Sequence, residues 1–257
     1  TGAGTNELTE TTATYNRISS NVFGTYEDTF NEAHHLTLTA GMNLETYHRK
    51  TVSASGQNLL STELNDLNLV GPDETGAIVS SVSGGKTAFS LLGFFGRVNY
   101  DFKGRYLFEA SARYDGTSRF APGQRWGFFP SAAFAWKINS EPFLKDVKSI
   151  SDLKLRLSWG QTGQQDTGME YYTPTYVHGT NNLYTYPIGS GNDGTLWKPL
   201  TYNEDLTWET TTTYNIGLDF GMWNQRLTMS LDVYKRKTTD LLCKPTIPAG
   251  MNFDNTM

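Results

Sequence analysis

The amino-acid sequence predicts an all-β fold, an antiparallel up-and-down meander of about eight strands. Polar and apolar residues alternate with a period of two in one segment after another, and the connections between these segments alternate between short and long. The composition agrees, because only 37% of the 257 residues are apolar although the chain carries 14 Tyr, 14 Phe, 6 Trp and 25 Gly. Such a chain suits long strands that keep one face in water and carry aromatic rings on the other.

The alternation is clearest in the segment 105–115. Its even positions, from Tyr106 to Tyr114, are aromatic or alanine, and its odd positions, from Arg105 to Arg113, are mostly charged or polar. A period of two places these sets on opposite faces of one strand. The segment 125–138 repeats the arrangement, and its apolar face is expected to hold Trp126, Phe128, Ala132, Phe134 and Trp136.

The other elements follow from the same pattern and from the turn signals between the strands. The remaining strands are predicted at 14–28, 34–49, 87–101, 154–160, 209–222 and 226–240. The strand at 14–28 alternates poorly, whereas the strand at 34–49 alternates well. Two short helices are also predicted, one with Leu60, Leu64 and Leu67 on one side and one beginning near Pro142.

The lengths of the connections predict a membrane barrel. Short turns occur at FNEAH, at Phe102–Gly104 and at Trp223–Gln225, and long polar loops are predicted at about 50–86 and 161–207. Alternate connections of a meander lie at opposite ends, so one end is nearly flat. Short periplasmic turns and long extracellular loops are typical of outer-membrane barrels. Strands of roughly ten to sixteen residues also exceed the usual length of roughly five to six and match a tilted bilayer crossing.

In this interpretation the aromatic face meets lipid and the charged face lines the lumen. A soluble sandwich could also bury the aromatic face of any one strand, but it gives no reason to segregate the loop lengths. Apolar runs stay well below the roughly 18 residues that a membrane helix needs, so any span must consist of strands.

The net charge, the N-terminal segment and the single cysteine argue against several classes of function. The net charge of −5 does not favour nucleic acid as a partner. The opening TGAGTNELTETT has neither the basic nor the apolar region of a signal peptide, so we expect a mature or internal segment. The lone Cys243 excludes an internal disulfide framework and a zinc site made of cysteines.

Several motifs resemble one family. The segment 92–144, LGFFGRVNYDFKGRYLFEASARYDGTSRFAPGQRWGFFPSAAFAWKINSEPFL, resembles the barrel of SusC/RagA-type TonB-dependent outer-membrane transporters of Bacteroidetes. The stretches HHLTLTAGMNLETYHRK, LKLRLSWGQTGQQD and WETTTTYNIGLDFGMWNQRLTMSLDVYKRKTTDLL are similar to the same family. The resemblance spans nearly the whole chain, and RYDGTSRF with RWGFFPS is its most specific part.

The resemblance implies more than the residues alone predict. Members of the family have an N-terminal plug domain that contacts TonB and a barrel of about 22 strands. They work with a SusD-like lipoprotein that sits over the barrel mouth in the cell outer membrane. This chain shows no recognisable plug and about eight predicted strands, so we interpret residues 1–257 as a partial barrel domain. A small closed barrel of eight strands is the alternative.

Catalytic, cofactor and metal sites are not predicted. The sequence has no G-x-S-x-G, Walker-type loop or HExxH motif. His34 and His35 are adjacent in a predicted strand and therefore face opposite ways, which disfavours joint metal ligation. We therefore expect a protein that is not an enzyme.

Two sets of residues are candidates for contact with a ligand or a partner. The first set consists of charged side chains expected to face the lumen, where they pair across strands or meet a plug or a solute: Arg97, Arg105, Glu109, Arg113, Asp115 and Arg119. The segment RYDGTSRF is expected to turn back into the lumen, with Gly116 permitting the bend and Asp115 capping it.

The second set consists of aromatic residues in the long loop 161–207. Aromatic rings stack on the apolar faces of sugars, and they also pack loops against themselves or against partner proteins. The residues of this set are Tyr171, Tyr172, Tyr176, Tyr184, Tyr186 and Trp197.

Two functions remain from the sequence. The first is TonB-dependent import of a nutrient through the outer membrane, with an oligosaccharide as the preferred substrate and a peptide as the other. The second is a soluble or surface-exposed β-domain that binds glycan without transport.

Overall fold

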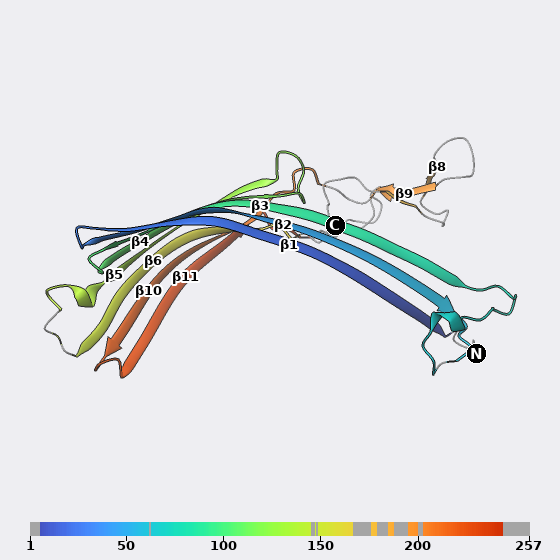
Figure 1. The fold of residues 1–257 in the computed structure, drawn as a ribbon, viewed down its shortest axis with the longest axis horizontal. Coiled ribbons are helices and arrows are strands. Elements are labelled where there is room, and N and C mark those ends of the chain that lie inside the picture. The colour runs from blue at the N-terminus through green and yellow to red at the C-terminus, as the bar shows by residue number, and fades with distance from the viewer. Residues whose placement is uncertain are drawn as a thin grey trace. The chain divides into compact units, whose positions relative to one another are not determined.

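The computed structural model describes residues 6–61, 63–144, 147, 149–166, 176–178, 185–187, 195–199 and 203–243. Eight strands form one antiparallel sheet in the order β1-β2-β3-β4-β5-β6-β10-β11, which confirms the predicted meander (Figure 1). The strands are β1 (Glu7–Phe30), β2 (His34–Gln57), β3 (Ser80–Phe102), β4 (Tyr106–Thr117), β5 (Trp126–Lys137), β6 (Ile150–Gln164), β10 (Glu209–Met222) and β11 (Leu227–Thr239).

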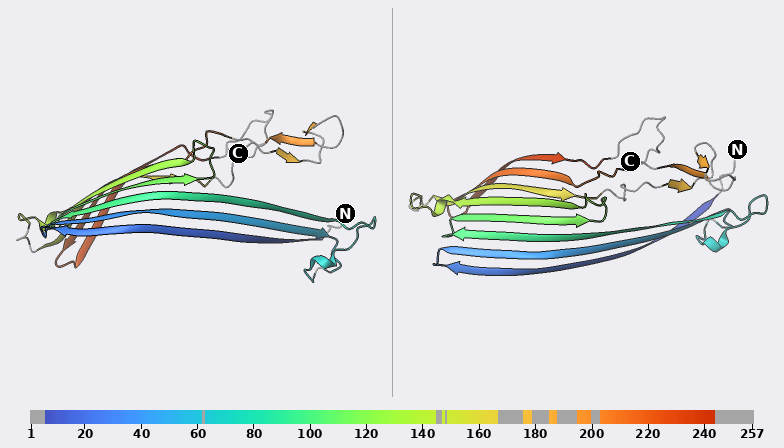
Figure 2. Two further views of the ribbon diagram at one scale, coloured as in Figure 1. Left: turned by 45° about the horizontal axis from the view of Figure 1, so that its top comes forward. Right: turned by 90° about the horizontal axis from the view of Figure 1, so that it is seen from above.

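The contacts within the chain define two compact units that share β1, β2 and β3. Residues 1–19 and 45–90 form the three-strand unit, which contains one part of each of these strands and the segment that joins β2 to β3. Residues 20–44 and 91–257 form the eight-strand unit, which contains the other parts of β1–β3 and all later strands. Figure 2 shows β4, β5, β6 and β10 following one another in sequence order within the eight-strand unit.

The strands β2 and β3 are longer than the sequence predicted, so the expected loop at about 50–86 is corrected to residues 58–79. Polar side chains continue the pairing beyond the apolar residues. The hydroxyl groups of Thr11 and Ser53 lie 2.9 Å apart, and those of Ser55 and Ser81 lie 2.8 Å apart. Strand pairing satisfies backbone N–H and C=O groups whatever the side chains are, and a strand with two polar faces shows no alternation.

The described residues form neither of the two predicted helices. The structure instead has two short 3₁₀ helices, η1 (Leu67–Leu69) and η2 (Ile138–Ser140), and η2 ends before Pro142. The backbone N–H of Leu60 donates to the carbonyl of Leu69, next to an antiparallel bridge between Leu59 and Val70. So short a segment gains too few helical hydrogen bonds to offset the cost of starting a helix.

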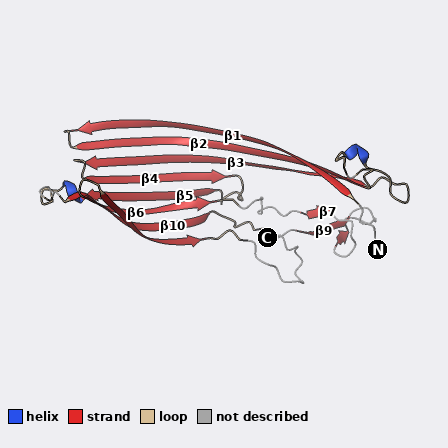
Figure 3. Ribbon diagram, turned by 90° about the horizontal axis from the view of Figure 1, so that it is seen from below, coloured by secondary structure: helices blue, strands red, loops and turns tan. Residues whose placement is uncertain are grey.

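The register of the strands from β3 to β11 produces one continuous apolar face. Figure 3 shows β3, β4, β5, β6 and β10 following one another across the sheet. Cross-strand partners stay apolar from β3 to β11 along the row Tyr100, Phe108, Phe134, Leu157, Ile216 and Val233. These side chains are not buried, because Ile216 is 58% exposed and Val233 is 65% exposed. A continuous exposed apolar surface of this kind marks a contact with lipid or protein.

Aromatic rings collect at the two ends of this apolar face. Near the short turns, the ring of Phe102 lies 4.8 Å from His34 and 6.2 Å from Tyr106. Near the opposite end, Trp126 stacks on Tyr114 at 4.7 Å. Tyr106 and Tyr114 are separated by about 26 Å of strand, which is a height of roughly 20 Å at the usual tilt. Two aromatic rows at this spacing match the girdles that flank the apolar band of an outer-membrane barrel.

Three further strands, β7 (Tyr176–His178), β8 (Thr185–Pro187) and β9 (Thr195–Pro199), form a small antiparallel sheet in the order β7-β9-β8. No helix in the described part of the chain is both long enough and apolar enough to cross a bilayer.

Candidate functional site

The face of the eight-strand unit opposite the apolar face is called the polar face here. One row of cross-strand partners on it runs from β3 to β11 and consists of Asn99, Glu109, Ala133, Ser158, Asn215 and Tyr234. Arg97, Glu109, Arg113 and Asp115 occupy alternate positions on the same face of β3 and β4. The structure therefore brings these predicted residues together, and their exposure to a lumen stays a prediction.

Arg113 is the centre of a small polar cluster on this face. Its guanidinium donates to Asp115 at 2.8 and 3.0 Å and to the side-chain oxygen of Asn43 at 3.1 Å. A Cβ at Gly93 would collide with the Asp115 carboxylate and the Asn43 side-chain oxygen, so a larger residue there would displace this cluster. The guanidinium also lies 5.7 Å from the centre of the Phe95 ring, within cation–π range.

The expected roles of Gly116 and Asp115 in the β4–β5 loop are corrected. Asp115 is engaged by Arg113, and the hydroxyl of Thr117 instead accepts from the backbone N–H of Arg119 at 3.2 Å. Gly116 is needed for space, because a Cβ there would lie 2.8 Å from the indole of Trp126. Sequence spacing could not reveal this, since the indole comes from the next strand.

The same loop folds back onto the polar face, and its expected turn into a lumen stays a prediction. Phe120 is fully buried and packs with Phe129, Leu206 and Trp208. The Trp208 ring meets those of Phe120 and Phe129 edge-on at 5.7 and 5.3 Å. The indole N–H of Trp208 donates to the carbonyl of Arg125 at 3.0 Å. Because Phe129 pairs with Arg113 across β4 and β5, this small core lies on the polar face.

Two of the predicted lumen arginines have different surroundings from the others. Arg119 forms an ion pair with Asp166, and its side chain is only 12% exposed. Arg105 precedes β4, so the strand alternation does not set its direction. It lies 3.3 Å from Glu141, which also accepts from the hydroxyl of Tyr106 at 2.6 Å and the indole of Trp136 at 3.0 Å. Arg105 therefore shares Glu141 with the aromatic row near the turns, and its exposure to a lumen stays a prediction.

Glu141 is the acceptor that satisfies the polar tips of that aromatic row. Glu141 is 7% exposed and lies between η2 and β6. The hydrogen bonds from Tyr106 and then from Trp136 hold the pKa of the Glu141 carboxyl below its ordinary value, and Arg105 acts in the same direction. A carboxylate that accepts such bonds is stabilised in its charged form.

A second cluster crosses β6, β10 and β11 and was missed in the sequence. The guanidinium of Arg156 donates to Asp219 at 2.8 and 2.9 Å and to Asp232 at 3.1 Å. A Cβ at Gly217 would lie 2.6 Å from Asp232 and 2.7 Å from Arg156. Glycine thus lets the guanidinium lie against the backbone of β10. Each residue sits at a polar position of its own strand, but only the register shows that they meet.

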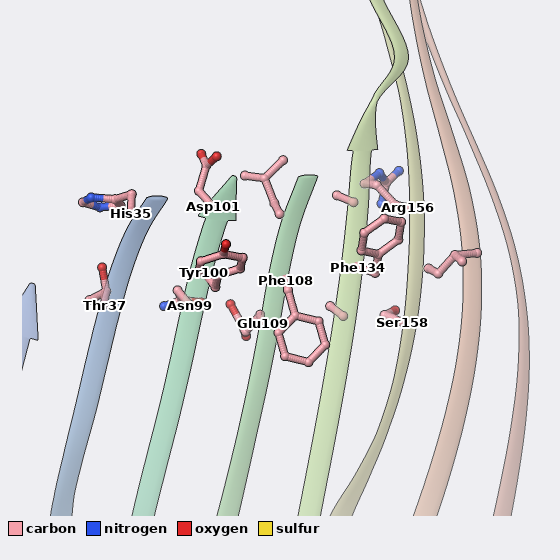
Figure 4. A pocket seen from close by; sticks show the side chains of 14 residues that line it. His35, Thr37, Asn99, Tyr100, Asp101, Phe108, Glu109, Phe134, Arg156 and Ser158 are labelled. Carbon is pink, nitrogen blue, oxygen red and sulfur yellow. The ribbon is translucent and has the colours of Figure 1, made fainter. Parts of the chain in front are cut away.

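A hollow of about 530 Å³ lies beside this cluster in the eight-strand unit (Figure 4). Its side chains on the polar face come from β2 to β6 and include His35, Asp101, Glu109 and Arg156. Ala133, Ala135 and Ser158 also line it, and such small side chains leave a depression between the longer charged ones. The arrangement can hold polar groups of a solute or of another protein segment. The described residues include no group of three metal-ligating side chains.

The predicted loop aromatics are only partly within the described chain. Tyr171, Tyr172 and Tyr184 lie outside the described residues. Tyr176 is in β7, Tyr186 in β8 and Trp197 in β9, so the backbone places these three in one small sheet. Their contact with a ligand or a partner stays a prediction.

The fold and its two faces define a section of the wall of a transmembrane β-barrel. The chain belongs to the TonB-dependent receptor-like β-barrel family, whose model matches residues 1–250. Its similarity to SusC and to RagAB, given next, confirms the SusC/RagA-type resemblance.

Among the relatives is the TonB-dependent receptor SusC of Bacteroides thetaiotaomicron, 52% identical over 173 residues, which are 66% of this chain and 17% of SusC. TonB-dependent receptor P26 of Formosa agariphila is 33% identical over 90% of this chain and 23% of P26. The solved structure of the RagAB peptide transporter superimposes with a TM-score of 0.75 at 27% identity, covering 93% of this chain and 26% of that one. The open-open state of the RagAB peptide importer gives a TM-score of 0.77 at 26% identity, with coverages of 96% and 26%. The chain thus spans about a quarter or less of each of these proteins, all of them named as receptors, transporters or importers.

Proposed function

We propose that this chain is a partial barrel domain of a transporter that imports a nutrient through the outer membrane, with an oligosaccharide as its substrate. The observation that carries the proposal is the two-faced sheet. An exposed apolar face bounded by two aromatic rows is suited to lipid, and a polar face with charged clusters is suited to a wet lumen.

The energy for import would come from TonB through a plug domain, as the SusC/RagA-type resemblance implies. A SusD-like lipoprotein would cover the barrel mouth, as the SusC/RagA-type resemblance implies. The hollow beside Arg156 and Asp101 lies on the face expected to meet the plug or a passing solute. Both partners follow from the resemblance, and neither is present in the structure.

Uptake by cells tests the transport proposal. A strain that lacks the gene would be compared with a strain that carries it, using fluorescent hexasaccharides of glucose, mannose and xylose. The proposal expects uptake only with the gene, and its loss when TonB is deleted or when the proposed SusD-like lipoprotein is removed. Uptake unaffected by deletion of TonB would contradict the energy source, and sugar uptake without the gene would contradict the transport role.

A peptide is the second candidate substrate, because the solved structures that match are named a peptide transporter and a peptide importer. The same strains would therefore be given fluorescent peptides of about ten residues. If the strains take up peptides and not sugars, the substrate is a peptide rather than an oligosaccharide. The proposal that the protein is a transporter would still hold.

The soluble glycan-binding module is the competing function of another class. It expects the isolated chain to be monodisperse without detergent and to bind sugar. The transporter proposal expects the chain to need detergent, because its exposed apolar face spans the eight-strand unit. Membrane fractionation of the intact protein would separate the two at once.

A further inference from the structure

The three-strand unit carries an aromatic cluster on one face of β1–β3. Tyr47 of β2 stacks on Phe89 of β3, with ring centres 4.8 Å apart and planes at 25°. Tyr15 of β1 lies 6.4 Å from Tyr47 with its ring tilted by 49°. The three rings therefore form a band across all three strands. Tyr15 is 59% exposed, so much of its ring remains accessible.

Charged groups border this band. The guanidinium of Arg49 lies 5.5 Å from the centre of the Tyr15 ring. Arg17 pairs with Glu45 at 2.8 Å, and the Arg17 side chain is 64% exposed while that of Glu45 is 16% exposed. The hydroxyl of Ser19 donates to the same carboxylate at 3.5 Å. Donors and acceptors for hydroxyl groups thus stand beside an accessible ring.

Lipid contact does not account for this cluster. In the eight-strand unit the aromatic rows lie on an apolar face, whereas the side-chain pairs further along this face of the three-strand unit are hydroxyl to hydroxyl, Thr11 with Ser53 and Ser55 with Ser81. Cross-strand stacking explains why Tyr47 and Phe89 pair. It does not explain why a third ring is left more than half exposed with an arginine over it.

We propose that Tyr15, Tyr47 and Phe89 form a sugar-binding subsite of the transporter. The C–H face of a pyranose would stack on the Tyr15 ring, since ring faces carry negative potential and a large apolar area. Its hydroxyl groups would donate to the Glu45 carboxylate and accept from the N–H groups of Arg17 and Arg49. The inference rests on the proposed oligosaccharide function and adds a place where the substrate is held.

Binding to the intact transporter in detergent tests the subsite. The probes are hexasaccharides of glucose, mannose and xylose, and the measurement is isothermal titration calorimetry. Tyr15→Ala should raise the Kd of the sugar that binds by about threefold to tenfold, the worth of one aromatic contact. Tyr15→Phe keeps the ring and should stay within about twofold of the wild type.

Tyr214→Ala is the matched control. Tyr214 is also an exposed tyrosine, at 53%, but it shares the apolar face of the eight-strand unit with Ile216, the face assigned to lipid. This variant should leave the Kd unchanged. Heat-dependent mobility in gels establishes that each variant is folded.

The outcomes distinguish failure of the proposed subsite from failure of the proposed oligosaccharide function. If the wild type binds sugar and both Tyr15→Ala and Tyr15→Ala/Tyr47→Ala bind it equally well, the subsite is overturned and the oligosaccharide function stands. If the wild type binds none of the three sugars, the oligosaccharide function and the subsite fail together. A loss of binding in Tyr15→Phe as large as in Tyr15→Ala would overturn ring stacking as the cause.

Discussion

The two parts of strand β3 carry the same backbone pairing with different side chains. In the eight-strand unit, Val98 and Tyr100 alternate with Arg97 and Asn99, and Val98 pairs with Ala110 of the next strand. In the three-strand unit, the positions around Val82 are serine and glycine on both faces. The comparison teaches that alternation of polar and apolar residues marks the part of a strand where one face is shielded from water. Strand formation itself needs only a hydrogen-bonding partner for the backbone.

The largest expected difference in stability is between variants that carry a charge in one part of β3 or in the other. Val98→Arg puts a guanidinium between the two aromatic rows, which should cost about 2–4 kcal/mol of stability near the bilayer midplane. Val82 is 78% exposed in the three-strand unit, and Val82→Arg should change stability by less than about 0.5 kcal/mol. Urea unfolding in liposomes, followed by gel mobility without boiling, measures both. Equal losses of stability in the two variants would contradict the view that only one part of β3 meets lipid.

A smaller effect is expected for the ion pairs of the two units. Arg156 donates to two aspartates and its side chain is 32% exposed, whereas the Arg17 side chain that meets Glu45 is 64% exposed. Arg156→Met should therefore cost about 1.5–3 kcal/mol, and Arg17→Met should cost clearly less, because solvent screens an exposed ion pair. The same unfolding assay compares them. A larger loss for Arg17→Met would mean that the exposed pair is the stronger one.

The smallest expected effect is a dependence of the stability on pH through two carboxyl groups. Hydrogen bonds hold the pKa of Glu141 below its ordinary value, and the Thr75 hydroxyl and the backbone N–H of Ala77 do the same for Asp73. A depressed carboxyl pKa stabilises the fold above the unfolded pKa of about 4, and this stability is lost as the pH falls through the folded pKa. Glu141→Gln should thus lower the unfolding midpoint at pH 7 and match the wild type at low pH.

Asp73→Asn should change that midpoint less at every pH, because Asp73 bonds only within its own loop, whereas Glu141 joins β4, β5 and the connector to β6. A midpoint difference for Glu141→Gln that stays constant from pH 7 to pH 3 would contradict the titration of Glu141.

The sequence predicted what local alternation controls. The strand β10 matches its predicted bounds, Glu209–Met222, because a polar loop and a tight turn enclose an unbroken alternation. The polar ends of β2 and β3 were missed because nothing in their side chains differs from a loop. The packing of Phe120 on Trp208 and the reach of Arg156 to Asp232 were also missed, since they join segments 88 and 76 positions apart.

The central claim is that one face of the eight-strand unit meets lipid while both faces of the three-strand unit meet water. Nitroxide labels on cysteines that replace Val98, Asn99, Val82 and Ser83, with Cys243→Ser as background, test it in liposomes. Power-saturation EPR should show the label at Val98 more accessible to oxygen than to a water-soluble nickel complex, and the labels at Asn99, Val82 and Ser83 more accessible to nickel. Equal accessibility at Val98 and Asn99, or oxygen preference at Val82, would contradict the account.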